Sequence, residues 1–107
     1  MPSATYDVFR NAILREQQVT CIYGGHIRQL CPHIIGTDAR GAEVVLAWQF
    51  AGESTGKLPN WRCLKLAGVR DAHAREGAWF EGGSHKQGQS CVSRIDLDIN
   101  IHVRKHR

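Results

Sequence analysis

Apolar side chains change their spacing several times along this chain, and each spacing predicts a different element. Over residues 5–17 they recur at helical intervals, which predicts one amphipathic helix capped by Ser3 or Thr5. The apolar face of that helix consists of Tyr6, Phe9, Ala12 and Ile13. Because the opposite face is polar, the helix should lie on a sheet and cover part of its core.

A β-hairpin is predicted directly after the helix. Residues 19–23 are rich in β-branched and aromatic side chains, which predicts a strand. Residues 26–30 follow a turn and are predicted to form the antiparallel partner strand. The turn is the dipeptide Gly24-Gly25, whose tolerance of positive φ suits a two-residue hairpin.

Two further strands are predicted in the middle of the chain. A turn at residues 38–41 leads into an almost unbroken apolar run at residues 42–50, which predicts a strand buried on both faces. A polar loop at residues 51–60 precedes a short strand at residues 61–66. One face of that short strand carries Trp61, Cys63 and Lys65, and the other carries Arg62, Leu64 and Leu66.

The C-terminal third shows three kinds of pattern. Residues 71–80 are ambiguous between a short helix and irregular chain, and residues 81–90 have three glycines and no apolar side chain, which predicts a mobile loop. Strict alternation then predicts a strand over residues 93–104 with one buried face and one polar face. The apolar members of this alternation are Ile95, Leu97, Ile99, Ile101 and Val103. The basic tail that follows is expected to be solvated.

The composition predicts one small domain over residues 1–107. The chain has 107 residues and 42% hydrophobic content, which suffices for a single core. It has no apolar run of transmembrane length and no pattern of a secretory signal. We therefore expect a cytoplasmic location and no membrane partner.

The cysteines are expected to be small buried hydrophobes. They are Cys21, Cys31, Cys63 and Cys91, and no two of them form a CxxC pair. Two disulfides are conceivable, but no export signal places the chain in an oxidising compartment. The alternative is a zinc site that combines some of Cys21, Cys31, His26 and His33. The tryptophans Trp48, Trp61 and Trp79 are expected to pack in the core or at its rim.

The charges suggest binding of an anion without requiring it. The net charge is +4, and some of the basic residues interrupt predicted strands, where charge is normally avoided. Tyr23, Arg28, Arg62 and Lys65 would together form a plausible anion or nucleotide pocket, because arginine matches phosphate and tyrosine offers a stacking face. The alternative, which the sequence favours, is that Arg28 and Arg62 form structural ion pairs with Glu43 or Asp38.

Several short motifs follow one another along the first two thirds of the chain. They are the Ala-Ile pair of the helix, Val19-x-x-Ile22-Tyr23, Arg28-x-x-x-Pro32, a glycine turn with an apolar strand, and Arg62-x-Leu64-Lys65-Leu66. This series, over residues 5–69, resembles the WYL domain of bacterial regulators. The resemblance implies a mainly β fold with one N-terminal α-helix, namely an Sm-like small β-barrel with strands over residues 19–69, to which the C-terminal strand at residues 93–104 is added.

The function implied by the resemblance is a regulatory module that senses a negatively charged ligand, such as single-stranded nucleic acid or a nucleotide. By position, Tyr23, Arg28, Arg62 and Lys65 would contact the phosphates. The chain departs from the family where Glu43-Val44-Val45 stands in place of Trp-Tyr-Leu, and where Gly68 replaces an arginine. Both departures should weaken anion binding.

Two other function classes stay open. The same domain could be a protein interaction or homodimerisation module that presents an edge strand and an aromatic patch. An enzyme that uses a cysteine or histidine is the weakest hypothesis, because the chain has no GxSxG, HExxH or Walker-type motif. We expect no catalytic residue, no metal and no cofactor.

Overall fold

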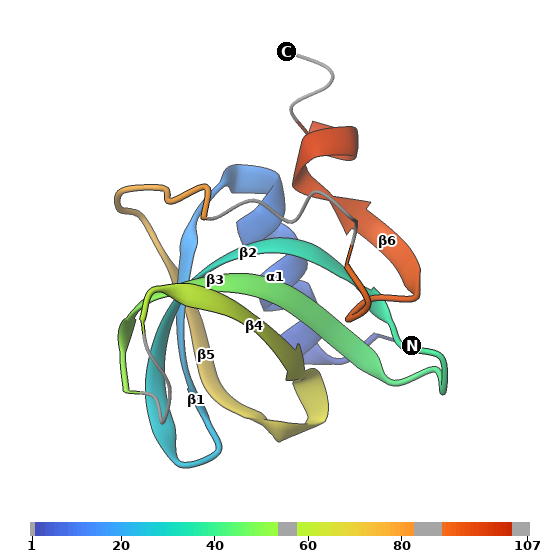
Figure 1. Ribbon diagram of the computed structural model, residues 1–107, viewed down its shortest axis with the longest axis horizontal. Helices are drawn as coiled ribbons and strands as arrows, with labels where there is room; N and C mark the ends of the chain where they lie inside the picture. Colours follow the sequence, from blue (N-terminus) through green and yellow to red (C-terminus); the bar gives the residue numbers. More distant parts are fainter. Residues whose placement is uncertain (1, 54–57, 83–88, 104–107) are drawn as a thin grey trace.

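The computed structural model describes residues 2–53, 58–82 and 89–103. Most of the loop that is expected to be mobile, and the basic tail, lie outside these residues. The elements follow in this order: α1 (Ala4–Arg15), β1 (Gln18–Tyr23), β2 (His26–Thr37), β3 (Glu43–Gly52), β4 (Asn60–Lys65), the 3-10 turn η1 (Leu66–Gly68), β5 (Val69–Arg75), β6 (Arg94–Asp98) and the π-helical turn η2 (Ile99–Val103). Figure 1 shows the curved sheet with α1 across one of its faces.

The six strands form one antiparallel sheet that is organised by β2. The strand order is β4-β3-β2-β1-β5, and β6 pairs with β2. One edge of β2 pairs with β3 over residues 28–37. The opposite edge pairs first with β1 over residues 26–30 and then with β6 over residues 34–37. Among the described residues β4 and β5 do not pair with each other, so the sheet is not closed.

A bulge in β2 separates the two pairing regions. The register with β3 shifts between Pro32 and Ile34. Proline has no N–H to donate, so it is tolerated in a strand mainly at an edge or at a bulge. At this place β2 changes its partner from β1 to β6.

The main core lies between α1 and the inner face of the sheet, by which we mean the face that α1 covers. The predicted apolar face of α1 is confirmed, because all four of its side chains are buried. They pack with residues from every strand, including Val19, Leu30, Val45, Leu64 and Leu97. Ser3 caps α1, since its Oγ accepts a hydrogen bond from the N–H of Tyr6.

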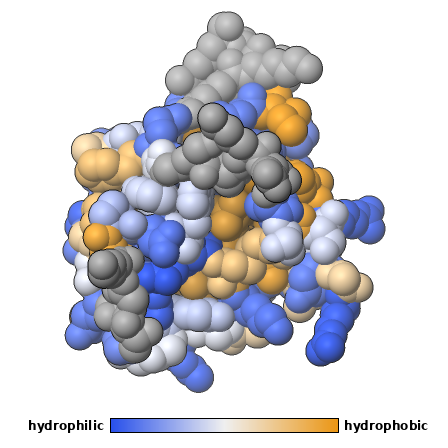
Figure 2. Space-filling model, in the orientation of Figure 1, coloured by the Kyte–Doolittle hydropathy of each residue, from blue (hydrophilic) through white to orange (hydrophobic). Residues whose placement is uncertain are grey.

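A smaller apolar cluster lies on the outer face of the sheet. Its buried members are Ile34, Val44, Leu46 and Val92. Figure 2 shows this side of the molecule, where hydrophobic surface lies among hydrophilic residues. Because β3 contributes to both clusters, the prediction that it is buried on both faces is confirmed.

The predicted hairpin is confirmed, whereas the interpretation of residues 71–80 as a short helix or irregular chain is right for residues 76–80 and wrong for residues 71–75. Gly24 and Gly25 have φ of 60° and 77°, and they join β1 directly to β2. Residues 71–75 lie in β5, which pairs with β1. Asp71 has a positive φ of 52° at a register shift, and this irregularity breaks the period-two pattern that would have indicated a strand.

The predicted C-terminal strand is too long. Strand β6 ends at Asp98, and the chain then turns into η2. Two local hydrogen bonds favour this turn: Asp98 Oδ1 accepts from the N–H of Asn100, and Nδ1 of His102 accepts from the N–H of Asp98. As a result the alternation does not define one buried face, and Ile101 is 51% exposed.

The prediction for the cysteines is right for two and wrong for two. Cys21 and Cys31 are buried free thiols. Cys63 and Cys91 form a disulfide across a sequence separation of 28 residues. A cross-link over a loop of this length stabilises a fold by about 3.5 kcal/mol, chiefly because it restricts the unfolded chain. None of the helices in the described part of the chain has the length and apolarity needed to cross a membrane.

Gly36 allows β6 to lie close to β2. A Cβ at this position would collide with the carbonyl oxygen of Arg94 and would lie 2.8 Å from Cγ1 of Val92. We expect Gly36→Ala to lower the free energy of unfolding by about 1–3 kcal/mol, because the clash displaces β6. Urea denaturation measures this loss. Arg94→Ala is the control, and it should stay within about 0.5 kcal/mol of the parent because its side chain is exposed.

Tyr6 ties α1 to β6 and makes stability depend on pH. Its hydroxyl donates a 2.6 Å hydrogen bond to Asp96. Burial, and then this bond, raise the pKa of Tyr6 from 10.0 to about 12. The folded state therefore keeps a proton that the unfolded chain releases, so this stabilisation is complete below pH 10 and is lost as the pH rises towards 12.

We expect Tyr6→Phe to lower the free energy of unfolding at neutral pH by about 1.5–3 kcal/mol, the typical contribution of a hydrogen bond to a charged acceptor. The variant should also lose less stability than the parent at alkaline pH. Urea denaturation across the alkaline range measures both effects. If the free energy of unfolding fell equally steeply with rising pH in parent and variant, Tyr6 would not be the source of the pH dependence.

Candidate functional site

Two arginines converge on one buried amide at the end of the inner face. Gln49 is 0% exposed. Its Oε1 accepts hydrogen bonds from a terminal nitrogen of Arg28 at 3.0 Å and from Nε of Arg62 at 3.4 Å. Its Nε2 donates to the carbonyl oxygens of Ala51 and Glu53 at 3.3 and 3.0 Å. Gln49 therefore holds two cationic side chains from β2 and β4 close together.

The alternation of the strands places these three side chains on one face. On β3, Val45 and Ala47 point into the main core, and Gln49 is next in the same series. On β4, Arg62 pairs with Ala47 and is two residues from the buried Leu64. The inner face thus changes from apolar to polar towards the end where β3 reaches Gly52.

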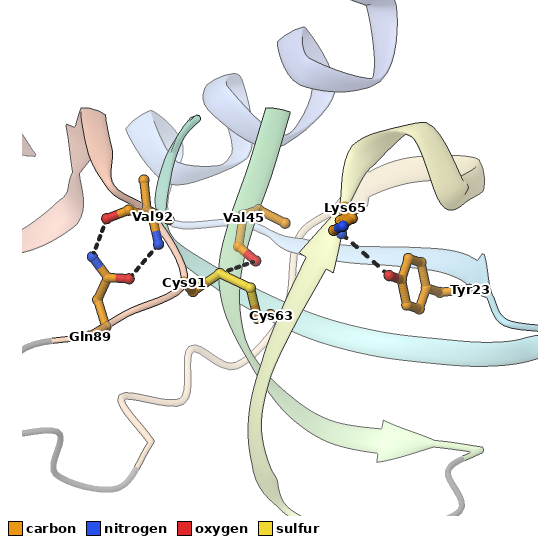
Figure 3. The surroundings of a disulfide bond; sticks show 7 residues. All are labelled: Tyr23, Val45, Cys63, Lys65, Gln89, Cys91 and Val92. Atoms are coloured by element: carbon orange, nitrogen blue, oxygen red, sulfur yellow. Dashed lines mark hydrogen bonds between the residues drawn. A yellow bond between two sulfur atoms is a disulfide. The ribbon is translucent and has the colours of Figure 1, made fainter. Parts of the chain in front are cut away.

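Tyr23 completes the cluster from β1. The Cζ atom of Arg28 lies 5.4 Å from the centre of the Tyr23 ring, and Nε of Arg28 donates to the Tyr23 carbonyl at 3.2 Å. The Tyr23 hydroxyl accepts a 3.3 Å hydrogen bond from the backbone N–H of Lys65, as Figure 3 shows. A Cβ at Gly68 would lie 3.1 Å from the ring, so the glycine that departs from the WYL pattern leaves room for Tyr23.

Lys65 joins this cluster through its backbone only. Its alternation with Leu64 directs the Lys65 side chain to the outer face. There its charge acts on Asp38. The pKa of Asp38 is lowered mainly by the hydrogen bond from the N–H of Ala42, and the charge of Lys65 adds to this effect. The structure therefore brings together three of the four predicted side chains, those of Tyr23, Arg28 and Arg62.

The expected ion pairs of Arg28 are wrong. Glu43 accepts hydrogen bonds from Ser3, and Asp38 accepts from the N–H groups of Arg40 and Ala42. Among the described residues, the hydrogen-bond acceptors of Arg28 are the neutral oxygens of Tyr23 and Gln49. The reason is the register of the sheet, because Arg28 lies opposite Gly52 at one end of β3 and Glu43 lies at the other. About 30 Å of strand separates them.

The tryptophans pack as the sequence predicts. Trp48 and Trp61 lie edge to face with ring centres 5.2 Å apart, and the His33 ring lies 5.0 Å from both Trp61 and Trp79. Trp61 packs against the smaller apolar cluster on the outer face, whereas Trp79 packs against the main core. The N–H of Phe80 donates to Sγ of Cys31 at 3.4 Å. Trp61 and Arg62 are adjacent in β4 and therefore point to opposite faces of the sheet.

The zinc alternative finds no support in the part of the chain that the structure describes, because it contains no group of three or more residues suited to hold a metal. Burial raises the pKa of Cys21 to about 11 and also raises that of Cys31. Both thiols are therefore protonated at neutral pH and poor metal ligands or nucleophiles.

Comparison with protein-family models, with curated proteins and with solved structures gives no match. The resemblance to WYL domains therefore stays a prediction. What distinguishes the site is its geometry, and its central residue, Gln49, is the one that the sequence patterns did not point to. The available signal was that Gln49 is the only strongly polar side chain within the apolar run at residues 42–50 after Glu43.

Removing the amide of Gln49 should loosen the cluster. We expect Gln49→Leu to lower the free energy of unfolding by about 1–3 kcal/mol, because Arg28 loses a buried acceptor and two carbonyls lose a donor. Urea denaturation measures the loss. Gln17→Leu is the control, since Gln17 is half-buried and lies outside the cluster. Equal effects of the two substitutions would show that Gln49 has no special role.

Proposed function

We propose that this chain is a regulatory module that binds a negatively charged ligand, such as single-stranded nucleic acid or a nucleotide, at the cluster of Tyr23, Arg28, Gln49 and Arg62. The observation that carries this proposal is Arg28. Arg28 is a half-buried residue, yet the acceptors of its guanidinium among the described residues are neutral oxygens. A phosphate would supply the missing counter-charge.

The surroundings of Arg28 suit recognition of a phosphate. Hydrogen bonds to the Tyr23 carbonyl and to Gln49 restrict the guanidinium to one orientation, so less side-chain entropy is lost when an anion binds. Tyr23 adds an aromatic ring at the same place, and a ring beside cationic groups is typical of sites that bind single-stranded nucleic acid. Lys65 is at most a peripheral contact in this proposal.

The finer fold assignment belongs to the same proposal. The strand order, the N-terminal helix on the sheet, and the three-residue turn η1 between β4 and β5 support an Sm-like small barrel of the WYL type. A cytoplasmic location, as expected from the sequence, is also part of it. The proposal includes no catalytic step, metal or cofactor.

A second candidate, protein interaction or homodimerisation, is favoured by the exposed apolar side chains near the C-terminus. Ile95 is 41% exposed and Ile101 is 51% exposed. Light scattering that gave the mass of a monomer would exclude a stable homodimer.

The test is a fluorescence anisotropy titration with labelled single-stranded DNA and RNA at several salt concentrations. We expect binding at low salt that weakens as salt rises. Arg28→Ala should weaken binding about tenfold or more, since a hydrogen bond to a charged group contributes about 1.5–3 kcal/mol. It should also lower the slope of log K against log salt by about 0.7 for each phosphate that the variant no longer neutralises.

Two matched pairs of variants control for charge. Arg94→Ala removes the same charge from an exposed position on β6 and should leave affinity almost unchanged. Gln49→Glu places a carboxylate beside Arg28 and should abolish binding, and urea denaturation checks that this variant is folded. Gln17→Glu makes the same change of charge outside the cluster and should leave affinity almost unchanged. If Arg28→Ala binds as well as the parent, or if neither oligonucleotides nor free nucleotides bind at low salt, the proposal fails.

A further inference from the structure

The disulfide Cys63–Cys91 has no role in the function proposed above, yet one of its cysteines is the sequence neighbour of Arg62, a member of the arginine cluster. Cys63 directly follows Arg62 in β4, and Cys91 lies in the segment that leads into β6. In Figure 3 the bond joins β4 to this segment close to Val45 of β3. The disulfide is thus a covalent link between two parts of the chain that meet on the outer face.

The four cysteines fall into two classes of accessibility. Cys63 is exposed and Cys91 is half-buried, whereas Cys21 and Cys31 are 3% and 0% exposed. Thiol–disulfide exchange requires that an external thiolate reaches a sulfur atom. Of the four cysteines, Cys63 is the one that lies in the exposed class, so the disulfide is the group most open to such an attack.

The segment around Cys91 has attachments besides the disulfide. Two hydrogen bonds between the side chain of Gln89 and the backbone of Val92, at 2.6 and 2.8 Å, fix its local shape. The N–H of Ser93 donates to Thr37, and Val92 is buried in the smaller apolar cluster, so the segment is also fixed to the sheet. Sγ of Cys91 also lies 3.7 Å from the carbonyl oxygen of Val45, so a reduced Cys91 thiol would have an acceptor ready.

Strand β4 holds the other end of the bond. It lies at the edge of the sheet, and among the described residues it pairs with β3 alone, over residues 60–65. Its further attachments include the core contacts of Leu64, the bond between Lys65 and Tyr23, and the hydrogen bond of Arg62 to Gln49. Cleavage of the disulfide therefore removes a constraint at the residue that follows Arg62, while Cys91 stays anchored.

We propose that Cys63–Cys91 is a site of thiol–disulfide exchange with a dithiol, and that its redox state controls how firmly β4 holds Arg62 against Gln49. A disulfide in a reducing compartment is usually transient or redox-sensing, which agrees with the cytoplasmic location proposed for this chain. The exchange itself does not depend on the proposed ligand. Its effect on affinity does rest on that function.

The exchange proceeds in two balanced steps. A thiolate of the dithiol attacks Sγ of Cys63, forms a mixed disulfide, and releases Cys91 as a thiolate that takes up a proton. The second thiol of the dithiol, after losing its proton, attacks the mixed disulfide and releases Cys63, which is protonated in turn. Two electrons and two protons pass to the cysteine pair, and the dithiol becomes a disulfide.

The first experiment treats the folded protein with dithiothreitol, alkylates it with iodoacetamide, and locates the labels by mass spectrometry. We expect labels on Cys63 and Cys91, and labels on Cys21 and Cys31 only after denaturation. Four free thiols in protein purified under air without reductant, or a disulfide that resists dithiothreitol until denaturant is added, would overturn the proposal.

Hydrogen exchange tests the effect on β4. In the reduced protein the amides of β4 should exchange faster, whereas those of β1 should not change. The double variant Cys63→Ser/Cys91→Ser should behave like the reduced protein with or without dithiothreitol. If this variant does not fold, the comparison between the oxidised and the reduced parent still tests the effect. Unchanged exchange in β4 would show that the bond does not control this strand.

The same two states are then compared for oligonucleotide affinity. We expect several-fold weaker binding after reduction, and no response to dithiothreitol in the double variant. Equal affinities in the two states would overturn the link between the bond and Arg62. Absence of binding in both states would instead overturn the proposed function, and the labelling and hydrogen exchange would still decide the exchange site.

Discussion

The change of partner along one edge of β2 is the constraint on which the structure depends. This strand pairs with β3 on one side, and with β1 and then β6 on the other. The bulge between Pro32 and Ile34 lies where β2 leaves β1 and has not yet reached β6. Proline suits this place, because it has no N–H that would need a partner strand. All other strands take their places relative to β2, and α1 covers the inner face that results.

The arginine cluster follows from the same arrangement. Because β3 runs alongside nearly the whole of β2, its side chains face α1 at one end and extend beyond the helix-covered core at the other. Val45 and Ala47 fill the core, and Gln49 ends the series among Arg28, Arg62 and Tyr23. A buried amide suits this position, since it can accept from two cations without neutralising either of them.

The two faces of β4 carry two different kinds of chemistry. Arg62 points towards Gln49, and Cys63 is bonded to Cys91 beside the smaller apolar cluster. Adjacent residues of a strand point to opposite faces, so a change in one side chain reaches the other through the backbone that they share. Strand β4 lies at the edge of the sheet and, within the described residues, has one ladder, so fewer hydrogen bonds oppose its movement than that of an inner strand.

Local patterns were enough to predict α1, the hairpin of β1 and β2, and the two-sided burial of β3, because helical spacing, a Gly-Gly turn and a long apolar run are properties of neighbouring residues. They failed for β5, where Asp71 interrupts the alternation, and beyond Asp98, where side chains bond to the backbone of a turn. The pairing of Cys63 with Cys91 and the convergence of Arg28 and Arg62 on Gln49 depend on which residues the register places side by side. Register is a relation between distant segments. Tyr23, Arg28 and Arg62 could therefore be named in advance from their residue types, but Gln49 and the contacts between these residues could not.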